Sequence, residues 1–329
     1  MELHELAVHD LVSTADARTL GLGPSDLRRL VRAGTVRRVI RGWYAVRPPG
    51  AGPAPWEGDD VFEAHRRRHR LLTVALVRSF DGRVAASHQS ALVLLGGRLW
   101  RSPLDVAHLA RSGDDHSRHR AMAVIHPLAS PTVLAAPGVP TVHPAHAVVQ
   151  VGLRSRGTGR PAMPFESLVA ADGALHDGLV SPDELVAAVA VHAGHPGIPG
   201  VRELLRWADG RHESVGETRL AQAMRALGYR FRAQVEYAVD GRLWRVDFEL
   251  EDEPVLIEFD GMGKYLAGLA APTPQQLQRA LAAEKWREDA LRSLGKQMAR
   301  VTWADLDVLG VIRDKIEAAR SLARLRRTA

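Results

Sequence analysis

The hydrophobic pattern of the last third of the chain predicts a small sheet. Apolar and polar residues alternate in Phe231–Val239 and Arg242–Leu250, and Asp240-Gly241 between them is a strong signal for a two-residue hairpin. In the second of these strands Val246 and Phe248 alternate with Asp247, which we therefore expect to point away from the face that they bury. The next segment, 255–261, is apolar almost throughout, as in a central buried strand.

Helical patterns surround these three strands. A helix is expected from Gly216 to Leu227, a second from Thr273 to Leu294, and a fourth strand from Gln297 to Thr302. The order is αβββαβ, and it predicts a domain over residues 214–329.

The first 47 residues predict a winged helix-turn-helix. Short helices are expected over 3–12, 15–20 and 27–33, followed by a hairpin of 36–40 and 43–46. In such a domain the third helix and the wing face DNA. Six arginines occupy these two elements and are the predicted DNA-binding residues: Arg28, Arg29, Arg32, Arg37, Arg38 and Arg41. The alternative is a solvated helix face in an arginine-rich chain.

The middle of the chain divides at stretches rich in Pro and Gly. Residues 48–58 are expected to be a linker, 59–155 a mixed α/β domain, and 156–213 a helical bridge. The chain as a whole is therefore expected to be an α/β multidomain protein.

Composition narrows the class of function. The net charge of +6 favours a polyanionic partner, and the absence of cysteine excludes disulfides and thiolate metal sites. No apolar run reaches the length of a membrane span and the N-terminus has no basic signal region, so we expect a cytoplasmic protein with no membrane partner. No H-E-x-x-H pattern occurs among the histidines, which argues against zinc hydrolases of that class.

Acidic residues on neighbouring strands predict a metal site. Asp247 and Glu258 could meet across adjacent antiparallel strands, and two converging carboxylates are usually tolerated around a divalent cation. We expect Mg²⁺ (or Mn²⁺) there, with Glu217 and Asp260 completing the inner or outer shell. Glu217 has an equally simple explanation as a first-turn carboxylate of its helix. A compact, titratable ammonium group could orient or deprotonate a water molecule at such a site. Lys264 is the first candidate for this role, and Lys285 is the second.

These residues resemble the PD-(D/E)XK nuclease superfamily, and within it the very-short-patch-repair (Vsr-like) endonucleases. The resemblance covers Ser214 to Asp307 and rests on G-E-T-R-L, V-D-F, I-E-F-D-G, A-E-K-W-R-E-D-A-L and R-V-T-W. It implies a restriction-endonuclease-like core that cleaves DNA with Mg²⁺, with Arg287 and Arg292 near phosphates. The chain departs from the pattern at Asp260, where the superfamily usually has lysine.

The N-terminal stretch resembles the winged-helix domain of AbiEi-type antitoxins. The resemblance rests on Arg41-Gly42-Trp43-Tyr44 and on the later segment Ser87-His88-Gln89-Ser90-Ala91. It implies DNA as a partner, together with a toxin protein, and a homodimer is a further candidate assembly. Two functions therefore stand side by side: a Mg²⁺-dependent DNA endonuclease, and a non-enzymatic repressor with an inactive nuclease fold.

Overall fold

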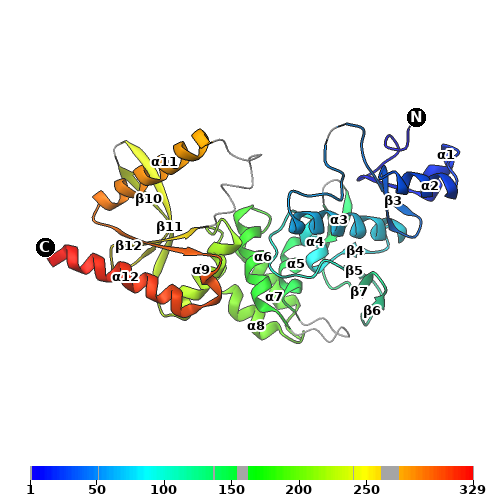
Figure 1. The fold of residues 1–329 in the computed structure, drawn as a ribbon. Helices are drawn as coiled ribbons and strands as arrows, with labels where there is room; N and C mark the ends of the chain where they lie inside the picture. The colour runs from blue at the N-terminus through cyan, green and yellow to red at the C-terminus, as the bar shows by residue number, and fades with distance from the viewer. Residues whose placement is uncertain are drawn as a thin grey trace. The chain divides into compact units, whose positions relative to one another are not determined.

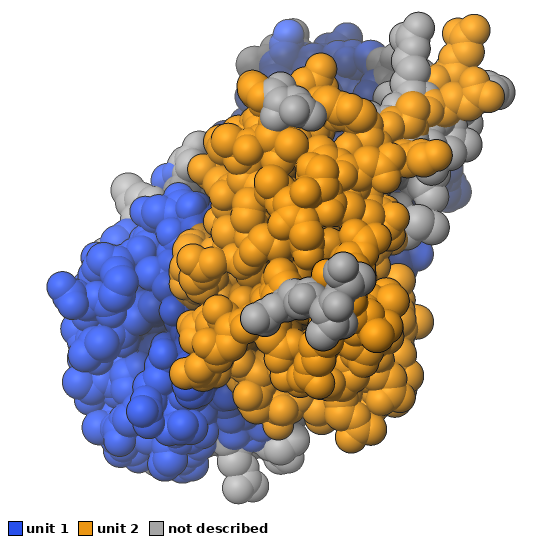
Figure 2. Space-filling model, turned by 90° about the vertical axis from the view of Figure 1, so that its left-hand side faces the viewer, with its two compact units in different colours: residues 1–208 blue, residues 209–329 orange. Residues whose placement is uncertain are grey.

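The computed structural model describes residues 2–50, 52–135, 138–153, 162–239, 241–260 and 274–328. The chain forms two compact units, residues 1–208 and 209–329, which Figure 2 colours separately. Within the described residues the chain has a mixed α/β architecture with three sheets. None of the helices in this described part is long and apolar enough to cross a membrane.

The N-terminal region contains two short helices and a three-stranded sheet in the order β1-β3-β2. Its elements are β1 (Leu11–Ser13), α1 (Thr14–Thr19), α2 (Pro24–Arg32), β2 (Val36–Ile40) and β3 (Trp43–Val46). The predicted helices at 15–20 and 27–33 and the predicted hairpin are therefore present, with small shifts at their ends.

The helix predicted over residues 3–12 is wrong. His9 and Asp10 both have positive φ angles, 59° and 64°, which no right-handed helix accommodates. Val8 and Leu11 exchange backbone hydrogen bonds across these two residues, at 3.0 and 3.2 Å. The segment is thus a tight hairpin turn that leads into β1, and β1 pairs with β3 in register Leu11 to Ala45.

The rest of the first unit is built on a six-stranded sheet in the order β6-β7-β5-β4-β9-β8. Its strands are β4 (Ala85–Ala86), β5 (Ala107–Arg111), β6 (Arg118–Arg120), β7 (Ala123–Pro127), β8 (Thr132–Ala135) and β9 (Val139–Val142). Its helices are α3 (Val61–Ser79), α4 (His88–Leu94), α5 (Pro144–Val151), α6 (Pro164–His176), α7 (Pro182–Val191) and α8 (Ile198–Leu205).

Two predicted subdivisions of this unit are not separate bodies. Ala54 and Trp56, from the expected linker 48–58, are buried in one core cluster with Leu71 of α3 and Leu11 of β1. The expected bridge 156–213 supplies α6, α7 and α8, whose apolar residues share a core with α4 and α5. Composition suggested linkers there, but packing joins these segments to their neighbours.

The second unit has a four-stranded sheet in the order β10-β11-β12-β13, between helices on both faces (Figure 1). The elements follow the order α9 (Val215–Ala226), β10 (Phe231–Val239), β11 (Arg242–Leu250), β12 (Val255–Asp260), α11 (Pro274–Ser293), β13 (Gln297–Thr302), η1 (Asp305–Asp307) and α12 (Leu309–Thr328). Strands β12 and β13 are parallel, and the other pairs are antiparallel. Helices α9 and α12 cover one face, and α11 covers the other.

Candidate functional site

All six arginines predicted to bind DNA are exposed on the N-terminal region. Arg28, Arg29 and Arg32 lie on α2, whose opposite side buries Leu27. Arg37 and Arg38 lie on β2, next to the buried Val36, and Arg41 lies in the turn before β3. Arg29 makes a surface ion pair with Asp26 at 3.1 Å, with 69% of its side chain exposed. The helix and the hairpin thus present a cationic surface suited to phosphates.

Two of the predicted acidic residues, Asp247 and Glu258, occupy one row across the sheet of the second unit. The register pairs Phe248 with Ile257, so the next residues along the two strands, Asp247 and Glu258, stand opposite each other. On the far side Glu258 pairs with Arg300 of β13. On the near side Asp247 stands opposite Gln234 of β10, because the register pairs residues 233 with 248 and 235 with 246.

This row lies where two strands change the face that their side chains occupy. Val246 packs with Leu291 of α11, whereas Phe248 packs with α9 and α12, so the two do not share a face as their alternation predicted. Gln234 has a positive φ of 53°, an irregularity that breaks the regular pleat beside Asp247. The Asp247 Oδ2 atom accepts a hydrogen bond from the backbone N–H of Phe259 at 2.8 Å.

Glu258 is held by an arginine. It is 7% exposed, and both of its oxygens accept hydrogen bonds from Arg287 of α11, one of them at 3.1 Å from Nη1. Arg287 also donates to the carbonyl of Arg245 at 2.9 Å. A guanidinium therefore balances the buried carboxylate from α11, and Arg287 is committed to an internal contact rather than displayed to solvent.

Glu217 caps its own helix. It is 3% exposed and accepts hydrogen bonds from Glu213 N at 2.8 Å, Ser214 Oγ at 2.7 Å and Gln234 Nε2 at 2.9 Å. These contacts are those of a first-turn carboxylate, and Gln234 connects it to the row that contains Asp247. Its predicted role as a metal ligand stays a prediction.

The remaining predicted residues are dispersed. Asp260 ends β12 opposite Thr302 of β13. Lys285 is exposed on α11, and Arg292 pairs with Glu288 on the same helix with half of its side chain exposed. Lys264 lies outside the described residues.

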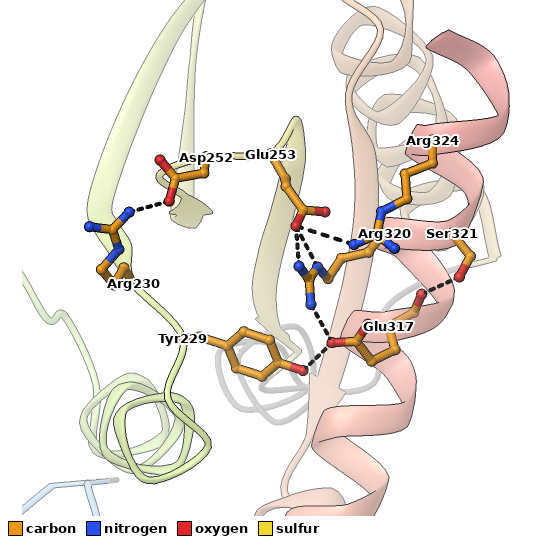
Figure 3. Close-up of polar contacts among 8 residues, drawn as sticks. All are labelled: Tyr229, Arg230, Asp252, Glu253, Glu317, Arg320, Ser321 and Arg324. Carbon is orange, nitrogen blue, oxygen red and sulfur yellow. Dashed lines mark hydrogen bonds and ion pairs between the residues drawn. The ribbon is translucent and has the colours of Figure 1, made fainter. Parts of the chain in front are cut away.

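The acidic turn before β12, residues 251–254, is neutralised by two elements: Asp252 pairs with Arg230, and Glu253 pairs with the C-terminal helix α12 (Figure 3). Glu253 accepts hydrogen bonds from Arg320 and lies 3.6 Å from Arg324. The hydrogen bonds from Arg320 hold the pKa of Glu253 below its usual value. Tyr229 donates to Glu317 at 2.8 Å, and burial together with this bond raises the pKa of Tyr229 to about 12. Arg320 and Arg324 of α12 are thus engaged by the chain's own acids.

The sequence did not predict a cluster of three histidines. His88, His108 and His126 are buried in the first unit, and their ligand atoms all lie within 4.8 Å of one another. Among the described residues it is the one group of three or more histidine, aspartate or glutamate side chains whose ligand atoms lie this close together. The members lie on α4, β5 and β7, so no local spacing could have shown them together.

The comparisons with known proteins bear on the N-terminal region. Residues 1–47 match the family of AbiEi antitoxin transcriptional regulators. This match covers the two helices and three strands that carry the six exposed arginines. The chain therefore has an N-terminal region of the AbiEi antitoxin type.

The other similarities are more distant. Two uncharacterized proteins of Mycobacterium tuberculosis, MT2308 and Rv2248, are each 33% identical over 122 residues, which is 36% of this chain. The match spans 42% of the length of these relatives. A crystal structure of the RV2827C protein from Mycobacterium tuberculosis aligns with 65% of this chain and 75% of its own, at 17% identity and a TM-score of 0.36.

Proposed function

We propose that the protein is a DNA-binding transcriptional regulator of the AbiEi antitoxin type. The observation that carries the proposal is the coincidence of the family match over residues 1–47 with the six exposed arginines on α2 and the β2–β3 hairpin. Helix α2 would lie in the major groove and the hairpin along the backbone, as in other winged helices. Arginine suits both sites because it binds phosphates and reads guanine edges.

The antitoxin family also implies a toxin as a protein partner. In that arrangement the winged helix would bind the promoter, and the rest of the chain would be available to the toxin. The second unit would then be a scaffold, consistent with the arginine that balances Glu258.

The salt dependence of DNA binding tests the proposal. We expect Arg28→Ala/Arg29→Ala/Arg32→Ala to weaken binding to duplex DNA from the chain's own upstream region. The slope of log K against log salt should become less steep by about 2–3, because each phosphate contact contributes about 0.9. Fluorescence anisotropy over a range of salt concentrations measures this slope.

A matched control removes three exposed arginines outside this surface, Arg83, Arg202 and Arg206. This variant should bind with the slope of the unmodified protein. Equal slopes for the unmodified protein and the α2 variant would exclude α2 as the DNA-contacting helix.

We propose DNA cleavage by the second unit as a second candidate function. It is supported by the αβββαβ order of the elements and by the register that sets Asp247 opposite Glu258. Carboxylates are the ligands that Mg²⁺ prefers, so the donor chemistry of the two residues fits this ion. When bound, the ion would polarise a phosphate and lower the pKa of a water molecule. Against this, Arg287 engages both oxygens of Glu258.

Incubation of supercoiled plasmid with the full-length protein and Mg²⁺ or Mn²⁺ tests this second candidate. If it cleaves, Asp247→Asn should abolish cleavage and Lys264→Ala should lower the rate by ~10²–10⁴-fold, with DNA affinity retained in both variants. Lys264→Arg should not restore the rate, because guanidinium is neither compact nor titratable. If the unmodified protein leaves the plasmid intact with both ions, the enzyme is excluded and the regulator remains.

A further inference from the structure

The first unit contains a cluster of imidazoles that neither candidate function uses. His88 begins α4, His108 lies on β5 and His126 lies on β7, and each is less than a tenth exposed. The ring centroids of His88 and His126 are 4.1 Å apart. The ring centroid of His108 lies 5.0 Å from that of His88 and 5.1 Å from that of His126. Three imidazole rings are thus packed together in the interior of the first unit.

The fold brings these residues together across elements. Strands β5 and β7 are parallel with Ala110 opposite His126, so His108 and His126 are diagonal neighbours on one face. The backbone N–H of Ser87 donates to the His108 carbonyl at 2.9 Å, which ties the start of α4 to β5. His88 itself has a positive φ of 51°. A conformation of this kind is costly outside glycine and is common at functional sites.

Hydroxyl groups orient two of the rings. His126 Nδ1 contacts Ser117 Oγ at 3.0 Å, and His88 Nδ1 contacts Ser87 Oγ at 3.0 Å. These contacts engage Nδ1 of both rings, so Nε2 is the second ring nitrogen of each; Nε2 of His126 contacts Nδ1 of His108. Outer-shell hydrogen bonds of this kind fix the tautomer and orientation of histidines that bind metals.

A neighbouring histidine fixes the position of His108. Nδ1 of His69 lies 2.7 Å from the Leu104 carbonyl, which can only accept, so this nitrogen carries the proton. The Ser90 hydroxyl must then donate to His69 Nε2, at 2.8 Å, and it accepts from the backbone N–H of His108, also at 2.8 Å. His69 therefore supports the cluster without belonging to it.

The spacing of the nitrogens is close to that of a metal site. His108 Nδ1 and His126 Nε2 are 2.9 Å apart and share a hydrogen bond, which an ion bound to both nitrogens would replace. Two nitrogens at about 2.0–2.1 Å from a tetrahedral zinc ion are separated by roughly 3.3 Å, so a small opening of this pair would admit the ion.

The cluster also opens onto a cavity. His88 and His126 line a cavity of about 460 Å³, together with Gln150, Asp115 and His192. A fourth ligand, water or an exogenous molecule, could therefore reach an ion held by the three imidazoles. Three protein ligands with one open position are characteristic of zinc sites that exchange a ligand.

We propose that His88, His108 and His126 form a binding site for a divalent transition-metal ion, with Zn²⁺ the best match to three imidazoles and one open position. This site lies in the first unit and is independent of the acidic row in the second unit.

Zinc binding to untagged full-length protein tests the proposal. Calorimetric titration with Zn²⁺ should give one tight site per chain, and His88→Gln and His126→Gln should each weaken it by at least ~100-fold, since even outer-shell changes cost 10–100-fold. The matched control is His212→Gln, which alters a buried histidine of the second unit and should leave affinity within about threefold.

A measurement on the unmodified protein covers the case in which a cluster variant fails to fold. X-ray absorption at the zinc edge should show about three imidazole nitrogens at about 2.0 Å. Binding that is absent, that persists in the folded His88 and His126 variants, or that shows no imidazole ligation would overturn the proposal.

Discussion

At the scale of single residues, a buried carboxylate in the first unit departs from its ordinary chemistry. Glu166 on α6 is 2% exposed, and its Oε2 atom accepts hydrogen bonds from Trp100 N at 3.1 Å and Ser102 Oγ at 2.6 Å. Burial raises the pKa of Glu166 to about 7, and the two hydrogen bonds only partly oppose this. The folded protein therefore holds a proton here that the unfolded chain releases near pH 4.5.

This shift predicts a pH dependence of stability. Because the folded state binds the proton more tightly, the free energy of unfolding should fall as the pH rises from about 4.5 to 7, by up to about 3 kcal/mol. Glu166→Gln resembles the protonated form and should remove this fall, so that the variant is the more stable protein at pH 7.5. Urea denaturation at a series of pH values measures the free energy of unfolding of both proteins.

Glu184→Gln is the matched control. This carboxylate caps α7, is exposed, and has a pKa lowered by its hydrogen bond with the backbone of Ser181, the opposite direction. The variant should keep the fall between pH 4.5 and 7. A Glu166→Gln protein with the same pH profile as the unmodified chain would show that Glu166 is not protonated in the folded state.

Sequence patterns identified single residues well where their role is local. Exposure of the arginines on α2 follows from helical periodicity, and the capping contacts of Glu217 follow from its place three residues after Ser214. The histidine group could not be found this way, because its members are separated by about twenty residues each and meet only through β5, β7 and the start of α4. The partner of Glu258 was missed for the same reason, since Arg287 was expected to contact phosphate.

At the scale of elements, the sequence predicted the helices and strands whose ends carry clear turn or capping signals. Strands β10 and β11 of the predicted hairpin, the capped helices and the apolar strand at 255–260 all appear close to the expected positions. The helix prediction for residues 3–12 failed because the leucines there have a roughly helical spacing. The left-handed turn at His9 and Asp10 contains no glycine that would have indicated it. The short strands β6 and β8 also gave no clear pattern.

One contact between elements shows how closely the second unit is packed. A Cβ atom at Gly216, in the first turn of α9, would lie 2.0 Å from Cε1 of Phe259 on β12. The Phe259 ring packs edge-on against Trp303 at 5.1 Å, so it has little room to move. The backbone N–H of Phe259 is also the donor to Asp247. Gly216 therefore allows α9 to approach the strand that positions the acidic row.

At the scale of the whole molecule, the chain contains two units with separate cores. The clusters around α4 to α8, around α3 and around the N-terminal sheet all lie within residues 1–208. The clusters around Phe248 and Val246 lie within residues 209–329. The sequence suggested more divisions than this, because stretches rich in Pro and Gly look like linkers even where neighbouring residues, such as Trp56, are buried.

Separate cores predict separate unfolding. Scanning calorimetry of the full-length protein at pH 7.5 should show two transitions, and substitutions should move one transition each. Glu166→Gln should raise the transition of the first unit alone. Gly216→Ala should lower that of the second unit alone, because overpacking costs about 1–3 kcal/mol and exceeds the gain in helix propensity. For domains of this size ~1 kcal/mol moves Tm by about 2–8 °C.

Gly310→Ala, on α12 with no atom closer than 3.9 Å, is the matched control and should not lower either transition. A single transition that both Glu166→Gln and Gly216→Ala displace would mean that the two units unfold as one.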